Sequence, residues 1–366
     1  MYYTNLVPNV QTSALGLGMV RYEQYDKDMF RNIDYAIEQG VNYIEACWFY
    51  LDGQCESRLA TALSRHKRDS YILVDKMPMG ALKTMTPDEF FPQQLKNCNT
   101  DYFDMYMLQA LDRNSFSLID KYNVLDFIDK KKKEGIVGHL GFSFHDTPEY
   151  LEKYLQMYNW DFVQLQLNYY DWFWTKGKEL YEMADKYNTN IVVMGPVKGG
   201  TLVKNLPIEA IRLLNDLDHT RSTASWAMRF LAGLPRVKVI LTGAEHFDML
   251  QENISLFDNP NGLSLTQEEI DTLEKVVNIY REKNYIACTG CGYCKCPRGI
   301  NIPKVFSLYN QLVKEYTDEK WEEMLKVIKN EAWATTCVGC KQCEKMCPQH
   351  LPIQQYMYKR LFHLRA

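Results

Sequence analysis

The sequence of 366 residues lacks the features that would place it in a membrane, in an export route or on nucleic acid. It contains no run of about 20 apolar residues, which a membrane-spanning helix requires. Its start, MYYTNLVPNVQTS, has neither the basic nor the apolar segment of a secretion signal. Its formal net charge of −4 excludes nucleic-acid binding through bulk positive potential. We therefore expect a cytoplasmic protein without a membrane or nucleic-acid partner.

Three common nucleotide and metal motifs are also missing. No phosphate-binding P-loop and no H-E-x-x-H zinc motif occurs in the sequence. Gly16 and Gly18 are followed by Arg21, where a dinucleotide-binding fingerprint has its third glycine. These absences argue against a doubly wound nucleotide-binding sheet.

Short apolar runs alternate with amphipathic stretches from Leu15 to about Asn253. Each predicted strand is followed by a helical pattern, as in 27–39, where Gly40 stands at the position of a helix-ending glycine. Eight such units in about 250 residues favour a parallel (β/α)₈ TIM barrel. The predicted strands are Leu15–Met19, Tyr43–Cys47, Tyr71–Met77, Phe103–Leu111, His139–Phe144, Phe162–Asn168, Ile191–Val197 and Val237–Thr242.

The composition changes abruptly at Tyr285, after a last predicted helix over 267–282. We therefore expect the barrel to occupy residues 1–284 and a small α-helical domain to occupy 285–366. Of the 11 cysteines, only Cys47, Cys55 and Cys98 lie in the barrel region, where they are expected to pack as small buried side chains.

The other eight cysteines form a doubled pattern, Cys288-x-x-Cys291-x-x-Cys294-x-Cys296-Pro297 and Cys337-x-x-Cys340-x-x-Cys343-x-x-x-Cys347-Pro348. This is the spacing of bacterial ferredoxins, in which the cysteine before proline ligates the other cluster. It predicts two [4Fe–4S] clusters. Their ligand sets are Cys288, Cys291, Cys294 and Cys347, and Cys337, Cys340, Cys343 and Cys296. Zinc is the alternative, but four-cysteine zinc sites usually show two separate C-x₂₋₄-C knuckles.

Several segments, in order along the chain, carry a family resemblance. They are GVNYIEACWFY at 40–50, VDKM at 74–77, FDMYMLQALD at 103–112, GFSFH at 141–145, VQLQLNYYD at 163–171 and the pair Glu252-Asn253. Together with the doubled cysteine motif, they resemble the aldo-keto reductase superfamily, in particular its branch with a C-terminal ferredoxin-like domain. The resemblance covers almost the whole chain.

That family uses a catalytic tetrad of Asp, Tyr, Lys and His, which the resemblance places at Glu45, Tyr50, Lys76 and Gln109. A free phenol titrates near ~10, and a neighbouring ammonium lowers that pKa toward neutrality. The resemblance thus implies that Tyr50 exchanges the proton, Lys76 tunes it and Glu45 orients the lysine. Gln109 cannot titrate and only hydrogen-bonds the substrate. Because glutamine stands where the family has histidine, the resemblance leaves reduction of a conjugated enone open beside reduction of a carbonyl.

The same resemblance implies a nicotinamide site with several departures from the family pattern. It would comprise Ser143 and Gln164 at the carboxamide, Met194 against the ring, and Gly243, Glu245 and Asn253 after the eighth strand. Acids stand where many relatives bind the 2′-phosphate of NADP through Lys and Arg. A carboxylate there favours NADH over NADPH.

Two functions remain open at this level. The first is an NAD(P)H-dependent oxidoreductase that acts on a small carbonyl, alcohol or enone. The second is an electron-transfer or non-reductase protein in which the barrel is a scaffold with weak or no nicotinamide binding. Coupling one-electron clusters to a hydride normally needs an intermediary such as a flavin, and the sequence has no flavin motif. The clusters can act as a structural staple, exchange electrons with an external partner or feed a bound flavin.

Overall fold

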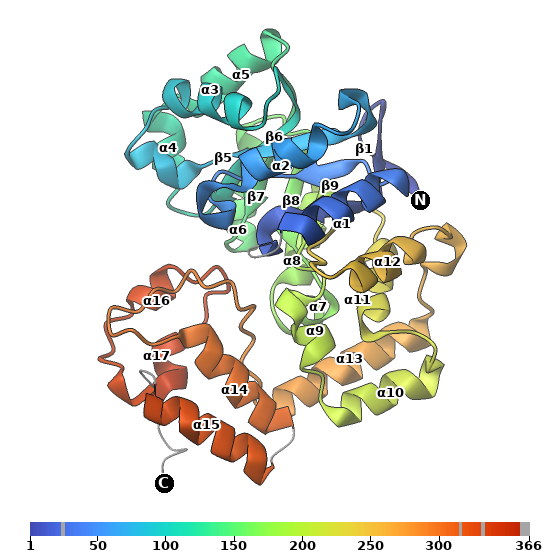
Figure 1. Ribbon diagram of the computed structural model, residues 1–366, viewed down its shortest axis with the longest axis vertical. Helices are drawn as coiled ribbons and strands as arrows, with labels where there is room; N and C mark the ends of the chain where they lie inside the picture. Colours follow the sequence, from blue (N-terminus) through green and yellow to red (C-terminus); the bar gives the residue numbers. More distant parts are fainter. Residues whose placement is uncertain (23–25, 315–316, 331–333, 359–366) are drawn as a thin grey trace. The chain divides into compact units, whose positions relative to one another are not determined.

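The computed structural model describes residues 1–22, 26–314, 317–330 and 334–358 (Figure 1). The chain forms two compact units. Unit 1 comprises Met1–Pro196 and Met228–Leu265, and unit 2 comprises Val197–Ala227 and Thr266–Ala366. None of the described helices is both long and apolar enough to cross a membrane.

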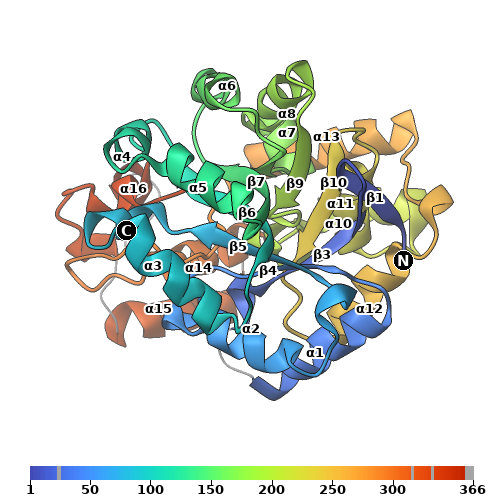
Figure 2. The same ribbon diagram turned by 90° about the horizontal axis from the view of Figure 1, so that it is seen from above.

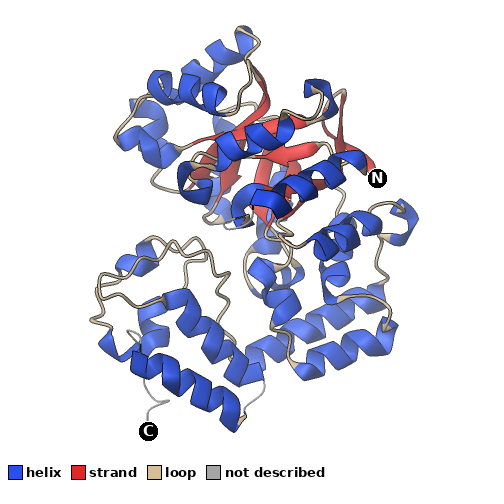
Figure 3. Ribbon diagram, in the orientation of Figure 1, coloured by secondary structure: helices blue, strands red, loops and turns tan. Residues whose placement is uncertain are grey.

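Unit 1 contains a closed barrel of eight parallel strands in the order β10-β3-β4-β5-β6-β7-β8-β9. Figures 2 and 3 show these strands inside unit 1, with helices such as α1, α3, α5 and α8 outside them. The strands are β3 Leu15–Gly18, β4 Tyr43–Glu45, β5 Ile72–Met77, β6 Phe103–Leu111, β7 Val137–Phe144, β8 Phe162–Gln166, β9 Asn190–Met194 and β10 Val237–Thr242. Each overlaps one predicted strand, so the barrel fold is confirmed.

The helices of unit 1 each follow a barrel strand in sequence, as a βα repeat requires. They are α1 Asp26–Glu38, α2 Cys55–Leu63, α3 Pro87–Asn97, α4 Phe116–Lys121, α5 Val124–Lys133, α6 Pro148–Met157, α7 Tyr169–Trp174, α8 Gly177–Lys186 and α12 Phe247–Leu256. Helix α3 begins at a capping box, in which the side chains of Thr86 and Glu89 each satisfy a backbone N–H of the other residue. Helix α11, Thr223–Ala232, includes residues of both units.

The barrel interior is apolar up to its last layer. Side chains alternate between the two faces of a strand, so every second residue faces inward. Tyr43, Val74, Met107, Phe162 and Val192 belong to one buried apolar cluster. The residues two positions further along the same strands are Glu45, Lys76, Gln109, Gln164 and Met194. The sequence therefore places a mostly polar layer at the carboxyl ends of the strands, where TIM barrels hold their active sites.

An antiparallel hairpin precedes the barrel and was not predicted. It consists of β1, Tyr3–Val7, and β2, Val10–Ser13. Leu6 and Val7 are buried in the same apolar cluster as Tyr43 and Phe162, which begin their strands. The hairpin therefore closes the amino-terminal end of the barrel and leaves the opposite end for chemistry.

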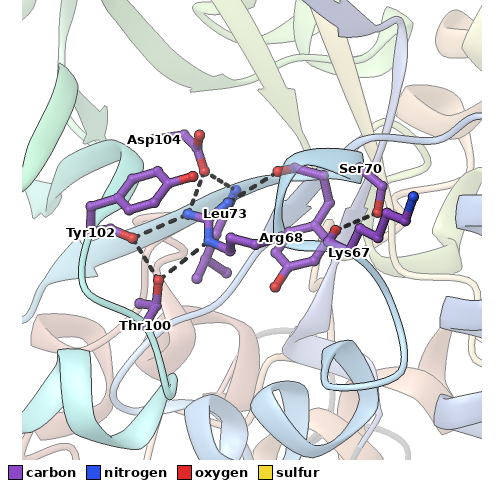
Figure 4. A network of polar contacts seen from close by, with 8 residues as sticks. Lys67, Arg68, Ser70, Leu73, Thr100, Tyr102 and Asp104 are labelled. Carbon is purple, nitrogen blue, oxygen red and sulfur yellow. Dashed lines mark hydrogen bonds and ion pairs between the residues drawn. The ribbon is translucent and has the colours of Figure 1, made fainter.

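A polar network fixes β5 against β6 at that amino-terminal end (Figure 4). Arg68 donates to Asp104 at 2.7 Å and to the Tyr102 carbonyl at 3.1 Å. Asp104 also accepts the backbone N–H of Leu73 at 2.8 Å. Because β5 and β6 are parallel neighbours, this network sets the register of the two strands that carry Lys76 and Gln109.

Unit 2 is helical in its described part. It contains α9 Thr201–Lys204, α10 Ile208–Asp218, α13 Gln267–Glu282, α14 Ile302–Lys314, α15 Asp318–Asn330, α16 Gln342–Lys345 and α17 Ile353–Tyr356. Phe306, Met324 and Ile353 belong to a buried apolar cluster against which six of the cysteines pack. The stretches 285–301 and 337–341 between these helices have no helix or strand. The domain boundary between residues 284 and 285 stays a prediction.

Candidate functional site

Three of the four candidate catalytic side chains come from neighbouring strands, and the fourth comes from the turn after the first of these strands. Glu45 ends β4, Lys76 lies near the end of β5 and Gln109 lies near the end of β6. Tyr50 begins a short 3₁₀ turn after β4, in which Leu51 and Asp52 both have positive φ. Since β4, β5 and β6 pair in parallel, all four residues belong to the same end of the barrel.

Three of these side chains are in direct contact. The Lys76 ammonium donates to Glu45 Oε1 at 2.5 Å and to the Tyr50 hydroxyl oxygen at 3.0 Å. Lys76 is 1% exposed and Glu45 is 3% exposed, whereas Tyr50 is half-buried. The lysine is therefore held in the barrel wall between a carboxylate and a phenol that reaches toward solvent.

The charge on Lys76 is stabilised by its neighbours. Burial by itself lowers the pKa of this ammonium, because a charged group loses water. The charges of Glu45 and Tyr50 outweigh burial, so the pKa of Lys76 lies well above its usual value. Lys76 thus remains an ammonium throughout the neutral range and can donate to the phenol oxygen.

Glu45 also reaches a second strand. Its Oε2 accepts a hydrogen bond from the side-chain amide of Gln164 on β8. Both carboxylate oxygens consequently have partners, one cationic and one neutral. Gln164, a predicted nicotinamide ligand, uses its amide nitrogen within the protein.

Gln109 lies at a bulge in β6, and Ser143 lies on the neighbouring strand β7. The register between β6 and β7 shifts between Leu108 and Leu111, and Ala110 has φ of 53°. The Ala110 N–H donates to Ser143 Oγ at 2.7 Å. The Gln109 carbonyl oxygen Oε1 is buried and has no hydrogen-bond partner in the described part of the chain. An orphaned buried acceptor is costly, so this atom marks a place for a ligand's donor.

The remaining predicted nicotinamide residues are spread over β9, β10 and α12. Met194 is half-buried against the barrel interior, and Gly243 is exposed just after β10. Glu245 is half-buried, and its backbone carbonyl accepts from the Asn32 amide at 3.0 Å. Asn253 on α12 donates to Thr242 Oγ1 at 2.9 Å. The last contact holds α12 to the end of β10.

Sequence reasoning missed a buried polar network on the outer side of β5. The Gln94 amide nitrogen lies 3.1 Å from Glu56 Oε1, 3.2 Å from Asp75 Oδ2 and 3.0 Å from the Lys76 carbonyl. Burial and the negative charge of Glu56 raise the pKa of Asp75 well above its usual range. The signal was present in the run YILVDKM, where Asp75 is as unexpected in an apolar strand as Lys76.

The cysteines of unit 2 surround two hollows. The first is lined by Cys288, Cys291, Cys294 and Cys347. The second is lined by Cys296, Cys337, Cys340 and Cys343. Each hollow thus combines three cysteines of one motif with the proline-flanked cysteine of the other. Among the described residues, no three His, Cys, Asp or Glu side chains gather on a single ion-sized point.

The segment after β9 packs on the first hollow. Lys198 is 2% exposed, and its ammonium donates to Gln349 Oε1 at 3.3 Å. Thr201 Oγ1 donates to the Cys288 carbonyl at 3.3 Å. A Cβ on Gly199 would lie 2.2 Å from the Thr289 carbonyl oxygen, so only glycine fits this close approach. Burial raises the pKa of the Cys288 thiol to about 11, an effect that the Lys198 charge opposes.

Comparisons with known proteins place both regions. A model of the aldo/keto reductase family matches residues 14–278, and a model of a 4Fe–4S dicluster domain matches residues 287–352. The uncharacterized oxidoreductase YqkF of Bacillus subtilis is 23% identical over 303 residues, which cover 73% of this chain and 93% of that protein.

Two solved structures share the fold. The aldo-keto reductase AKR11C1 of Bacillus halodurans, in its holo form, has a TM-score of 0.63 at 22% identity over 75% of this chain and 96% of that one. An aldo/keto reductase from Klebsiella pneumoniae, solved with NADP and acetate, has a TM-score of 0.59 at 18% identity over 73% of this chain and 92% of that one. At these identities the likeness concerns the fold.

Proposed function

The chain belongs to the aldo/keto reductase family and carries a C-terminal 4Fe–4S dicluster domain, and from this premise we propose that Tyr50 exchanges a proton with the oxygen of a carbonyl, alcohol or conjugated enone. One observation carries the proposal, namely the contact of the Tyr50 hydroxyl with the Lys76 ammonium at 3.0 Å. A buried ammonium this close stabilises the phenolate that forms when the proton leaves.

Glu45 keeps that ammonium in place. A buried lysine without a counter-charge would lose its proton or leave the barrel wall. The 2.5 Å contact with Glu45 compensates the charge and directs the remaining N–H bonds toward Tyr50. Glu45 is therefore a positioning residue, and its second carboxylate oxygen is held by the Gln164 amide.

Gln109 positions the substrate in this proposal. Its orphaned carbonyl oxygen accepts a hydrogen bond from a ligand hydroxyl or amine. This polarity favours substrates that carry a donor beside the reacting oxygen, because an apolar group at this position would leave the acceptor unpaired.

The polar layer also fits a nicotinamide. A nicotinamide bound there would supply the hydride. Ser143 accepts the Ala110 N–H and retains its own hydroxyl proton to donate, while Met194 offers an apolar surface at the mouth. Gly243, Glu245 and Asn253 would border the remainder of the cofactor, with the Glu245 carboxylate favouring NADH over NADPH.

The donor set of unit 2 fits two [4Fe–4S] clusters, one in each hollow. The first would be held by Cys288, Cys291, Cys294 and Cys347, and the second by Cys296, Cys337, Cys340 and Cys343. Four thiolates per hollow satisfy the ligand requirement of each cluster. We further propose that residues 285–366 form this domain, that the protein is cytoplasmic and that its clusters exchange electrons with an external partner.

A second candidate function has one observation in its favour. Gln164 and Asn253 each donate a side-chain N–H to another part of unit 1 rather than keeping it for a ligand. In this alternative the barrel is a scaffold with weak or no nicotinamide binding, and the clusters carry the activity.

An anaerobic binding titration separates the two candidates. We expect NADH to quench the tryptophan fluorescence of the cluster-loaded protein with higher affinity than NADPH. Tyr50→Phe should bind NADH like the wild type, since the substitution removes only the proton donor. Failure of both nucleotides to bind would refute the reductase proposal and support the scaffold. Iron, sulfide and flavin analysis of the same preparation counts the clusters and shows whether a flavin is present.

A further inference from the structure

The two cysteine segments carry an excess of exposed cations in a chain whose net charge is −4. Residues 288–298 and 337–347 contain Lys295, Arg298, Lys341 and Lys345, and their one acid is Glu344. All four cations are exposed, and none forms an ion pair with a described residue. The Glu344 carboxylate accepts the backbone N–H of Gln354 at 2.8 Å. With four cations and one carboxylate, the two segments carry a net positive charge.

Two of these cations line the second hollow, and a third lies one turn further along the chain. Arg298 and Lys341 line it together with Val338 and Cys340. Lys341 is the residue before α16, and the backbone N–H of Lys345 at the end of this short helix donates to the Lys341 carbonyl at 3.4 Å. Val338 is 60% exposed, which is unusual for an aliphatic side chain beside a cavity. We call Arg298, Val338, Cys340, Lys341 and Lys345 the Cys340 surface.

The two sets of four cysteines differ in the exposure of one member. Cys340 is exposed, whereas the four cysteines of the first hollow are half-buried. The first hollow is also bordered by the buried Lys198 and by the Thr201 contact to Cys288. A cluster in the second hollow thus has a ligand at the protein surface, and Val338, Arg298 and Lys341 line the same hollow.

We propose that the Cys340 surface docks an acidic one-electron carrier protein, which reduces the cluster held by Cys296, Cys337, Cys340 and Cys343. The proposal rests on the proposed function, because it requires that this hollow contain a cluster. The carrier, a reduced iron–sulfur or flavin protein, loses one electron and the cluster gains it, and no bond forms or breaks. Acidic groups on the carrier complement the three cations and accelerate encounter, while Val338 forms the desolvated centre of the contact.

A stopped-flow measurement tests this surface in the full-length, cluster-loaded protein. The probe is a reduced acidic bacterial ferredoxin, mixed anaerobically at low and high salt. We expect Arg298→Glu/Lys341→Glu/Lys345→Glu to slow cluster reduction at low salt by at least about tenfold, and high salt to slow the wild type toward the same rate. Lys326→Glu, an exposed lysine of the same unit on α15, is the matched control and should leave the rate unchanged.

Two further measurements keep the outcomes distinct. Reduction by the cationic viologen radical should not slow in the triple variant, which shows that its cluster remains intact. If iron and sulfide are absent from the wild type, the proposed function fails. If the clusters are present but the ferredoxin rate is insensitive to salt and to charge reversal, the docking surface is refuted.

If the triple variant loses its cluster, the single substitutions Val338→Gln and Lys345→Glu replace it in the rate measurement. Each should lower the ferredoxin rate by a smaller factor than the triple variant. A labelled RNA or DNA oligonucleotide provides the competing outcome, since phosphates also bind cations. Charge-sensitive oligonucleotide binding without any effect on ferredoxin would overturn the proposal.

Discussion

The barrel mouth and the cysteine hollows organise their reactive groups in opposite ways. At the mouth, strands β4, β5 and β8 supply Glu45, Lys76 and Gln164, and every charged group already has a partner within the protein. In unit 2 the thiols lie mainly on stretches without regular structure and line the two hollows. The first site is organised by the apolar barrel, and the second depends on the group that it binds.

Removal of the clusters should produce the largest difference between the two regions. Chelation of iron under mild oxidation would leave eight thiols around two unfilled hollows, so 285–301 and 337–353 should lose protection against amide exchange. The barrel strands should keep theirs, because their core contains no cluster ligand. Hydrogen exchange with mass spectrometry measures both at once. An equal loss of protection in β4 and β5 would show that the stability of the barrel depends on the clusters.

Lys76→Met tests how much the buried ion pair of Glu45 and Lys76 stabilises the barrel. The substitution leaves the Glu45 carboxylate buried without its counter-charge, which should destabilise unit 1 by about 3–5 kcal/mol. Urea unfolding followed by tryptophan fluorescence measures this loss. The double variant Glu45→Gln/Lys76→Met should recover part of it, because it removes the unpaired charge as well. An unchanged midpoint for Lys76→Met would mean that Glu45 is solvated or neutral in the wild type.

Asp75→Asn tests the network behind Lys76 through pH. The pKa of Asp75 is raised in the folded protein, so the native state holds a proton that the unfolded state releases above about pH 4. The stability contributed by this proton is complete below pH 4 and is lost as pH rises through the raised pKa. Asp75→Asn should flatten this decline in urea midpoints. Asp69→Asn, at an exposed position, should retain the wild-type slope, and equal slopes in all three proteins would contradict the assignment.

Lys198→Met should have the smallest effect, confined to one hollow. The substitution removes a buried positive charge near Cys288, so the reduction potential of the first cluster should fall by tens of millivolts while that of the second stays constant. Potentiometric titration followed by electron paramagnetic resonance measures both. Lys204→Met, which removes an exposed charge from the same segment, is the control. A shift of both potentials or of neither would contradict the contrast between the hollows.

Most of the barrel could be predicted from the sequence because its signals are local. The predicted strand Phe103–Leu111 coincides with β6, and the helix expected over 267–282 coincides with α13, Gln267–Glu282. The amino-terminal hairpin was not predicted because buried and exposed residues do not alternate along β1. Three partly or fully exposed residues precede the buried Leu6 and Val7. Its burial depends on strands that begin far along the chain.

The site was only partly predictable for the same reason. Lys76 and Asp75 are recognisable in the sequence as charged residues within an apolar strand. The sequence does not show which side of the barrel wall each side chain faces. The Glu45–Gln164 bond joins residues 119 positions apart, and neither residue carries a local sign of it. The orphaned oxygen of Gln109 likewise follows from packing around a bulge rather than from residue type.

The turnover of Tyr50→Phe is the most direct test of the central claim, that a phenol beside a buried ammonium exchanges the proton. The assay uses anaerobically purified, cluster-loaded protein with a panel of aldehydes, ketones and conjugated enones, and NADH as reductant. For any substrate that the wild type reduces, we predict that kcat falls by about 10²–10⁴ while NADH affinity is retained. A variant that reduces the same substrate at the wild-type rate would contradict the account.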